Sequence, residues 1–172
     1  MKVYKMTTTA FLTALAVVFH YIESLLPAFI AIPGFKLGLA NIVGVFSLFY
    51  LGPWYYVAIQ LLRILIVALI STGFGTPFFL ALGGGVLSLI AGLLLYKFTK
   101  VSIYGVSVVC AFFHVLGQIV VYLLIVQTFY MILYLPVLAA LAMLSGGLLA
   151  VLAAMVIKIL PPFDNMVRIR RR

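Results

Sequence analysis

Long stretches in which nearly every residue is apolar follow one another from Met6 to Leu160. A helix needs about 20 mostly apolar residues to cross roughly 30 Å of hydrocarbon. Of the 172 residues, 67% are hydrophobic and only 8% are charged, which is too few charges to cover the surface of a soluble domain. The sequence therefore predicts a single integral membrane domain over 1–172, with an all-α fold.

Prolines, glycines and short polar segments divide the apolar stretches into six predicted membrane helices. Gly52 and Pro53 end the second helix, the segment 71–77 forms the clearest loop, and Pro161 with Pro162 stops the sixth helix. A short basic tail follows at 161–172. The predicted helices cover about 6–32, 37–51, 54–70, 78–96, 102–126 and 132–160.

The positive charges predict the direction of these helices, because Lys and Arg are retained in the cytoplasm during insertion. With six helices and a cytoplasmic N-terminus, only Lys36 lies outside and Arg63 lies within a helix. The apolar run after Lys5 continues past Ala31, so we expect a retained helix and not a cleaved signal peptide. We predict a multi-pass protein of the cytoplasmic membrane with both termini in the cytoplasm. The other nine of the eleven Lys and Arg residues then lie inside: Lys2, Lys5, Lys97, Lys100, Lys158, Arg168, Arg170, Arg171 and Arg172.

Several classes of function are disfavoured by composition. The topology already explains the formal net charge of +9, so we expect no nucleic acid as a partner. The single cysteine, Cys110, is expected to be a small packed side chain. No Gly-rich Walker loop is present, and the only carboxylates, Glu23 and Asp164, are too few to hold Mg²⁺ for diphosphate chemistry. We therefore expect no enzyme, no cofactor and no metal site.

Polar side chains within the predicted helices are the candidate functional residues, because each is costly in a bilayer unless it is paired or faces a cavity. The predicted topology places these groups on four helices, at similar depth in the outer half of the membrane or near its midplane. A shared cavity that opens outward would account for this arrangement. The candidate substrate-binding residues are His20, Glu23, Lys36, Asn41, Gln60, Arg63, His114 and Gln118.

Three interpretations of this polar cluster remain open. Arg63 cannot realistically lose its proton, so it needs an anion, a carbonyl group or water. Glu23 is the obvious internal partner, and a buried Glu23–Arg63 pair could merely fix the helix register. The further polar groups at the same level favour a site for a small, anionic or polar organic ligand. A proton relay through His20, Glu23 and His114 is the third interpretation.

Two further features fit a ligand site. Phe19, Tyr21 and Phe113 could supply flat aromatic walls. The segment from Gly34 to Asn41 begins a helix, and backbone N–H groups at a helix N-terminus suit a carboxylate or phosphate.

Small residues recur at every fourth position on three of the predicted helices. In lipid such stripes let backbones approach closely. We expect most of them to pack within the chain, although one could dock a partner helix. The stripes are Ala10 and Ala14; Gly84, Ser88 and Gly92; and Gly146, Ala150 and Ala154.

Several of these motifs together resemble a known membrane family. They are the run Pro33-Gly34-Phe35-Lys36-Leu37-Gly38-Leu39-Ala40-Asn41-Ile42, then Arg63, Gly83-Gly84-Gly85, Gly105-Val106-Ser107, His114 and Gly117-Gln118. From about residue 7 to 160 the chain resembles heptaprenyl diphosphate synthase component I, also called the Gx transporters. In that family an Asn often follows the histidine, whereas this chain has Val115.

That family in turn resembles the substrate-binding S components of energy-coupling factor (ECF) transporters. The resemblance implies a six-helix subunit whose first helix docks a T component driven by two ATPases, and Ala10 and Ala14 match this docking face by spacing. We therefore expect a substrate-binding membrane subunit of an ECF-type transporter, in contact with a small-molecule ligand, the T component, ATPase subunits and lipid.

Two alternatives remain. One is a non-catalytic membrane partner in polyprenyl or quinone biosynthesis or in flavin-linked electron transfer, and the other is a proton-coupled carrier. The sequence names neither the ligand nor the oligomeric state.

Overall fold

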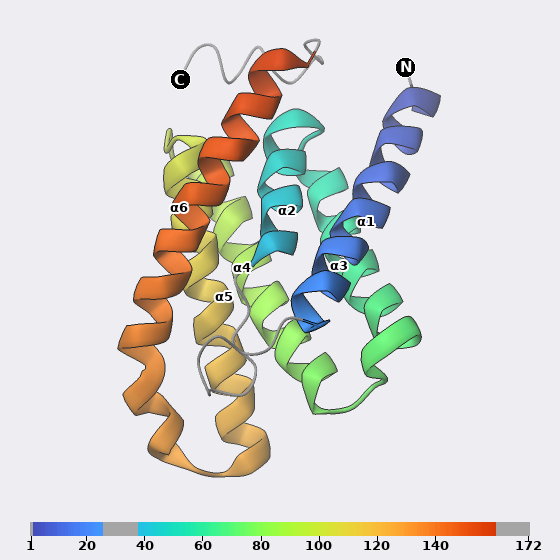
Figure 1. Ribbon diagram of the computed structural model, residues 1–172. Helices are drawn as coiled ribbons and strands as arrows, with labels where there is room; N and C mark the ends of the chain where they lie inside the picture. Colours follow the sequence, from blue (N-terminus) through green and yellow to red (C-terminus); the bar gives the residue numbers. More distant parts are fainter. Residues whose placement is uncertain (1, 26–37, 161–172) are drawn as a thin grey trace.

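A computed structural model of the chain describes residues 2–25 and 38–160. These residues form a bundle of six α-helices and contain no strand (Figure 1). A π-helical turn, η1 (Ala68–Thr72), follows α3, and a 3-10 helix, η2 (Phe129–Tyr134), precedes α6. The α-helices are α1 (Lys2–Leu25), α2 (Leu39–Tyr50), α3 (Pro53–Val67), α4 (Thr76–Phe98), α5 (Ile103–Val126) and α6 (Leu135–Ile159).

Five helical segments among the described residues are long and apolar enough to cross a membrane, which makes this a multi-pass membrane protein. The exception is α2, with 12 residues. At about 1.5 Å per residue such a helix covers only about 18 Å of the roughly 30 Å of hydrocarbon. The all-helical membrane fold predicted from the sequence is confirmed, but α2 does not reach across the bilayer by itself.

Glycine and proline set most helix boundaries. Gly38 precedes α2 with a φ of 81°, in the left-handed region that glycine adopts without strain. Pro53, Pro77 and Pro136 each lie in the first turn of a helix, where a missing N–H costs nothing. The sixth helix was predicted from about 132, but the α-helical hydrogen bonding begins only at Leu135.

Two other boundaries differ from the predicted ones. The third helix was predicted to reach residue 70, whereas α3 ends at Val67 and the chain continues as η1. The first helix begins at Lys2 and its described part ends at Leu25, so the predicted remainder to residue 32 lies outside the described residues, as do Lys36 and the basic tail.

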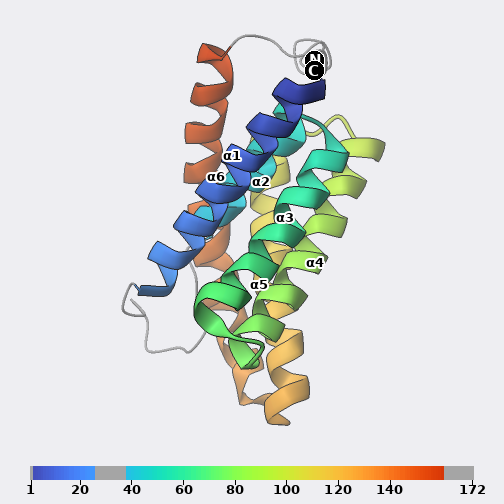
Figure 2. The same cartoon turned by 90° about the vertical axis from the view of Figure 1, so that its right-hand side faces the viewer.

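The start of α1 and the end of α6 lie at the same end of the bundle (Figure 1). We call this the inner end and the opposite one, at η2, the outer end. This arrangement agrees with the predicted termini on one side of the membrane, whereas their cytoplasmic location remains a prediction. Figure 2 shows α1 inclined across the bundle in front of the more upright α6.

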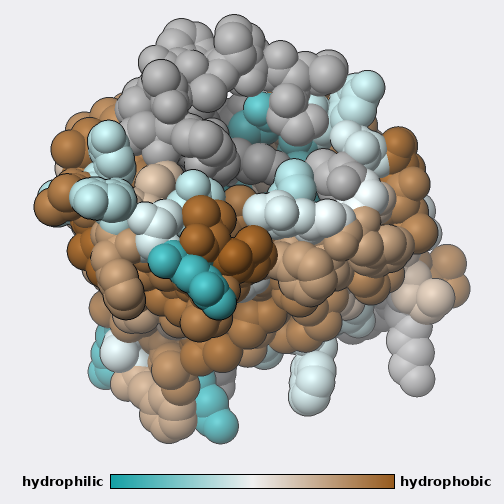
Figure 3. All heavy atoms as spheres, turned by 90° about the horizontal axis from the view of Figure 1, so that it is seen from below, coloured by the Kyte–Doolittle hydropathy of each residue, from teal (hydrophilic) through white to brown (hydrophobic). Residues whose placement is uncertain are grey.

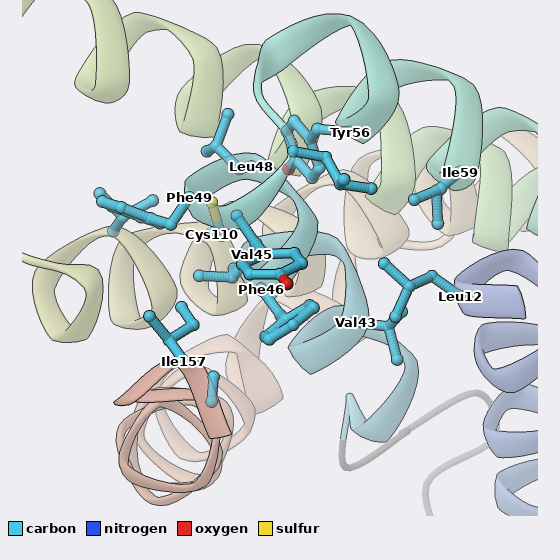
Figure 4. Packing of buried hydrophobic residues seen from close by; sticks show 14 of the residues in the cluster. Leu12, Val43, Val45, Phe46, Leu48, Phe49, Tyr56, Ile59, Cys110 and Ile157 are labelled. Carbon is cyan, nitrogen blue, oxygen red and sulfur yellow. The ribbon is translucent and has the colours of Figure 1, made fainter. Parts of the chain in front are cut away.

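The hydrophobic core surrounds α2, which packs against α1, α3, α5 and α6. Leu48 of α2 and both Tyr56 and Ile59 of α3 are fully buried. Figure 4 shows Val43 and Phe46 of α2 between α1 and α6. Because the short α2 packs against these helices, it positions the polar residues that α1 and α3 contribute.

Helices α4, α5 and α6 are held together by small residues. A Cβ added at Gly117 of α5 would lie 2.4 Å from the carbonyl oxygen of Gly83 in α4, so only glycine permits this approach. The Ser107 hydroxyl donates a hydrogen bond to the Gly146 carbonyl at 2.7 Å, which joins α5 to α6. Two of the three small-residue stripes are thus packed within the chain, in agreement with the expectation.

Candidate functional site

Every candidate polar residue within the described part of the chain is buried. The exposed fractions do not exceed 9%, although the flank of the bundle is covered with exposed apolar side chains. Seen from the outer end, apolar side chains make up much of the visible surface, with scattered hydrophilic ones among them (Figure 3). The residues are His20 and Glu23 on α1, Asn41 on α2, Gln60 and Arg63 on α3, and His114 and Gln118 on α5.

Arg63 is the most strongly buried charge, with 2% of its surface exposed. Its Nη1 donates a hydrogen bond to Oδ1 of Asn41 at 3.4 Å, and Glu23 attracts its guanidinium electrostatically. Within residues 2–25 and 38–160, its Nε has no hydrogen-bond partner. A guanidinium carries five N–H donors in a planar fork, and leaving one unsatisfied in a buried place is costly. The Nε–H of Arg63 is therefore a spare donor to which an oxygen atom can be hydrogen-bonded.

Glu23 is held at the N-terminus of α2. Its carboxylate accepts a hydrogen bond from the backbone N–H of Gly38, which caps that helix. A negative charge at a helix N-terminus is favourable because the peptide dipoles leave a partial positive charge there. The sequence predicted that the N-terminus of α2 could bind the anionic group of a ligand. In the structure, the carboxylate of Glu23 already accepts a hydrogen bond there.

The polar residues of α5 are positioned by the glycines of α4. A Cβ at Gly84 would lie 2.7 Å from the carbonyl oxygen of His114 and 2.8 Å from Cγ of Gln118. The bare backbone at Gly84 therefore lets α5 approach so closely that His114 and Gln118 lie directly against α4. Arg63 is hydrogen-bonded to Asn41 and attracted by Glu23, and His114 and Gln118 approach Gly84 of α4.

A second set of buried polar side chains continues the line of Gln60 and Arg63 along α3. The sequence analysis did not predict this set. The Tyr56 hydroxyl donates to the Ser88 carbonyl oxygen at 3.4 Å, and the Cys110 thiol donates to the same oxygen at 3.5 Å. Gln60 follows Tyr56 by one helical turn on α3, and both side chains are buried. Tyr56, Gln60 and Arg63 follow one another at helical spacing on one face of α3, and that spacing was the signal that would have revealed Tyr56.

Two of the aromatic residues expected as walls lie elsewhere. Phe19 lines an apolar groove between α1, α2 and α6, and Tyr21 is 43% exposed on the flank. Phe113 packs edge to face against Phe112 on α5.

The small residues Ala10 and Ala14 of α1 are both exposed. They line a shallow groove of about 720 Å³ on the α1–α3 face, which we call the alanine groove. Unlike the other two stripes, this one is exposed on the surface of the bundle.

Within the described residues no group of three or more His, Cys, Asp and Glu side chains could hold a metal ion.

Comparison with known proteins identifies the family. The model of the heptaprenyl diphosphate synthase component I family matches residues 12–156, which is most of the chain. This protein belongs to that family. No curated protein and no solved structure matches it.

Membership in the component I family covers the helices from Leu12 in α1 to Val156 in α6, and it therefore includes every candidate site residue on α1, α2, α3 and α5. The family's description names a component of a heptaprenyl diphosphate synthase. This description agrees better with the alternative of a membrane partner in polyprenyl biosynthesis than with a transporter subunit.

Proposed function

We propose that this protein is a non-catalytic membrane subunit that binds a small organic ligand with an anionic or polar group at Arg63. The observation that carries the proposal is the buried guanidinium whose Nε has no partner among the described residues. A charge held at this depth costs several kcal/mol unless it is satisfied, so a ligand oxygen at Nε stabilises the protein.

The residues around Arg63 favour a ligand-binding role over a purely structural Glu23–Arg63 pair. Glu23 accepts a hydrogen bond from the start of α2 in addition to attracting Arg63, so its charge is shared between two groups. Asn41 contacts the guanidinium at 3.4 Å, which is long for a hydrogen bond to a charged donor. A carboxylate or phosphate oxygen in the ligand would complete the set of acceptors around Arg63.

Ligand-dependent thermal stability tests this function. Purified protein in detergent is heated with riboflavin, thiamine, isopentenyl diphosphate or 1,4-dihydroxy-2-naphthoate, which represent vitamins, isoprenoid phosphates and quinone precursors. At least one is expected to raise the unfolding temperature of the native chain and to have a much smaller effect on Arg63→Gln. Ser107→Ala, which alters a buried hydroxyl on the α5–α6 side, is the control and should retain the shift. An absence of shift for every compound would remove the main support for the proposal.

Within this function, the arrangement we favour is that of an ECF S component. The exposed alanine groove is the surface on which a T component would dock, with its two ATPases supplying energy. Ala10→Leu with Ala14→Leu should then abolish co-purification with a membrane partner and ATPases, while ligand binding at Arg63 is retained.

The family match favours a second candidate, a membrane component that works beside a soluble prenyl diphosphate synthase. The soluble enzyme would supply the Mg²⁺-binding carboxylates that this chain lacks, and this chain would hold the enzyme or its product at the membrane. Co-purification with a prenyltransferase, in the absence of any ATPase, would favour this candidate over the transporter subunit.

A further inference from the structure

Besides Arg63, the line of polar side chains along α3 contains a second atom whose hydrogen bond is not made. Gln60 is 2% exposed, and within the described ranges its Oε1 has no hydrogen-bond partner. A buried carbonyl oxygen without a donor is costly, because burial removes the water that would otherwise satisfy it. Gln60 therefore offers an acceptor in the same buried region in which Arg63 offers a donor.

The amide of Gln60 is oriented by α2. A Cβ added at Gly44 of α2 would lie 2.7 Å from Nε2 of Gln60 and 3.0 Å from its Cδ, so the nitrogen branch of the amide lies against the bare backbone of that helix. The ring of Tyr56 lies against the same glycine, at 3.1 Å from the added Cβ. Because the two branches of an amide point in different directions, Oε1 is the branch that is turned away from Gly44.

Ser88 of α4 contributes a third atom of this kind. Its side chain is fully buried, and its Oγ has no hydrogen-bond partner among the residues that the structure describes. Two contacts between α3 and α4 place this residue: Gly85 lies against Ile64, and the Ser88 carbonyl oxygen accepts the hydrogen bond of the Tyr56 hydroxyl at 3.4 Å. Ser88 therefore lies opposite the part of α3 that contains Gln60.

The missing hydrogen bonds of Arg63 and Gln60 are complementary. The two residues are three positions apart on one helix, which places their side chains on the same face. Nε of Arg63 can only donate a hydrogen bond and Oε1 of Gln60 can only accept one, whereas the Ser88 hydroxyl can do both. A group that accepts from Arg63 and donates to Gln60 would satisfy both atoms. A carboxylate alone cannot do this, because it has no hydrogen to donate.

We infer that the ligand of Arg63 is an organic acid that carries a hydroxyl or N–H group beside its acid group, and that Gln60 selects this ligand by accepting the hydrogen. The inference rests on the proposed function, because Arg63 anchors the acid group. The Ser88 hydroxyl, on the facing helix, can hydrogen-bond the same donor group. A bound water molecule would also satisfy these atoms, but in that case Gln60 would not affect which ligand binds.

Equilibrium dialysis of the full chain in detergent against two probes tests the inference. Both 4-hydroxy-2-naphthoate and 4-methoxy-2-naphthoate carry a carboxylate on the same ring system, but only the hydroxy compound can donate a hydrogen bond. It is expected to bind the native chain at least about fivefold more tightly, because the methoxy compound leaves the buried oxygen of Gln60 unsatisfied.

Variants of α3 assign this preference to one atom. Gln60→Met is similar in size but has no acceptor oxygen, so the ratio of the two dissociation constants should fall below about twofold. Gln60→Glu keeps an acceptor oxygen and should retain the preference. Leu61→Met is the matched control, since Leu61 is the neighbouring residue and is 40% exposed, and it should also retain the preference.

Three results would overturn the inference: equal binding of the two probes by the native chain, a preference that persists in Gln60→Met and so reflects only the bulk of the methyl group, or no binding of either probe. Arg63→Gln tests the proposed function separately, because it should weaken the binding of both probes. If the native chain binds the probes equally and Arg63→Gln weakens both, the proposed function stands without the inference. Undiminished binding by Arg63→Gln would instead remove the proposed function.

Discussion

The Glu23 carboxylate and the Gly38 backbone N–H are hydrogen-bonded, which ties the outer part of α1 to the first turn of α2. The same carboxylate attracts Arg63 of α3, so one acidic group connects three helices. In a membrane, where apolar side chains gain nothing by leaving lipid for protein, such polar contacts carry more of the specificity of packing than they do in water.

A double-mutant cycle measures this connection. Glu23→Gln is expected to lower the free energy of unfolding by about 1.5–3 kcal/mol, since the hydrogen bond from Gly38 is no longer charge-assisted and the attraction to Arg63 is lost. Combined with Arg63→Gln, the loss should be smaller than the sum of the single losses by about 0.5–3 kcal/mol. Unfolding in mixed SDS and detergent micelles reports these values. Additive losses would show that the two charges are not coupled.

The glycine at the contact of α4 with α5 should tolerate no side chain. Gly84→Ala places a Cβ 2.7 Å from the His114 carbonyl oxygen, so the helices must separate, and we expect a loss of about 1–3 kcal/mol in the free energy of unfolding. Gly147→Ala on α6 is the matched control, because its Cβ meets Val108 only at 3.7 Å. The control should be neutral or stabilising by up to about 1 kcal/mol, the gain in helix propensity. Equal effects at both positions would contradict the close α4–α5 contact.

Gly38 should be sensitive for a different reason. Its φ of 81° lies in the left-handed region, so Gly38→Ala is expected to cost about 1–2 kcal/mol. Gly38→Asn should cost less, because Asn tolerates this conformation better than Ala does, while both variants keep the backbone N–H that donates to Glu23. Thermal unfolding of the three proteins checks the order glycine, asparagine, alanine. A fully stable alanine variant would rule out the described start of α2.

The direction of the chain in the membrane can be measured with single cysteines in a Cys110→Ala background. Phe98→Cys lies at the inner end and Tyr130→Cys at the outer end, and both positions are more than 70% exposed. A membrane-impermeant maleimide added to intact cells should label Tyr130→Cys, and it should label Phe98→Cys only after permeabilisation. The reverse pattern would invert the predicted orientation.

The helices could be predicted well because the cause of their formation is local. Apolar runs interrupted by Gly52-Pro53 or by residues 71–77 leave few choices once backbone groups must be satisfied in lipid. The apolar runs did not reveal changes in backbone hydrogen bonding near the helix ends. At Ala68–Thr72, for example, a π-helical turn extends α3.

The burial of the candidate residues and the attraction between Glu23 and Arg63 could be expected from the sequence, whereas the hydrogen bond between Gly38 and Glu23 could not. Burial of a charge such as Arg63 is costly, so its presence in an apolar run indicates a partner, and the structure supplies Glu23 and Asn41. The bond from Gly38 to Glu23 depends on where α2 begins relative to α1, which is a tertiary relationship that residue spacing does not contain. Tyr56 was not predicted because a tyrosine is uncharged, and its presence in a membrane helix therefore does not by itself indicate a polar site.

The two grooves described above both border α1, one on its α6 side and the alanine groove on its α3 side. A strip of α1 that includes Leu12 and Ala16 is buried against its neighbours. Near the end of this strip the Glu23 carboxylate accepts a hydrogen bond from the start of α2. A shift of α1, whatever molecule contacts its exposed sides, would therefore be transmitted to the N-terminus of α2.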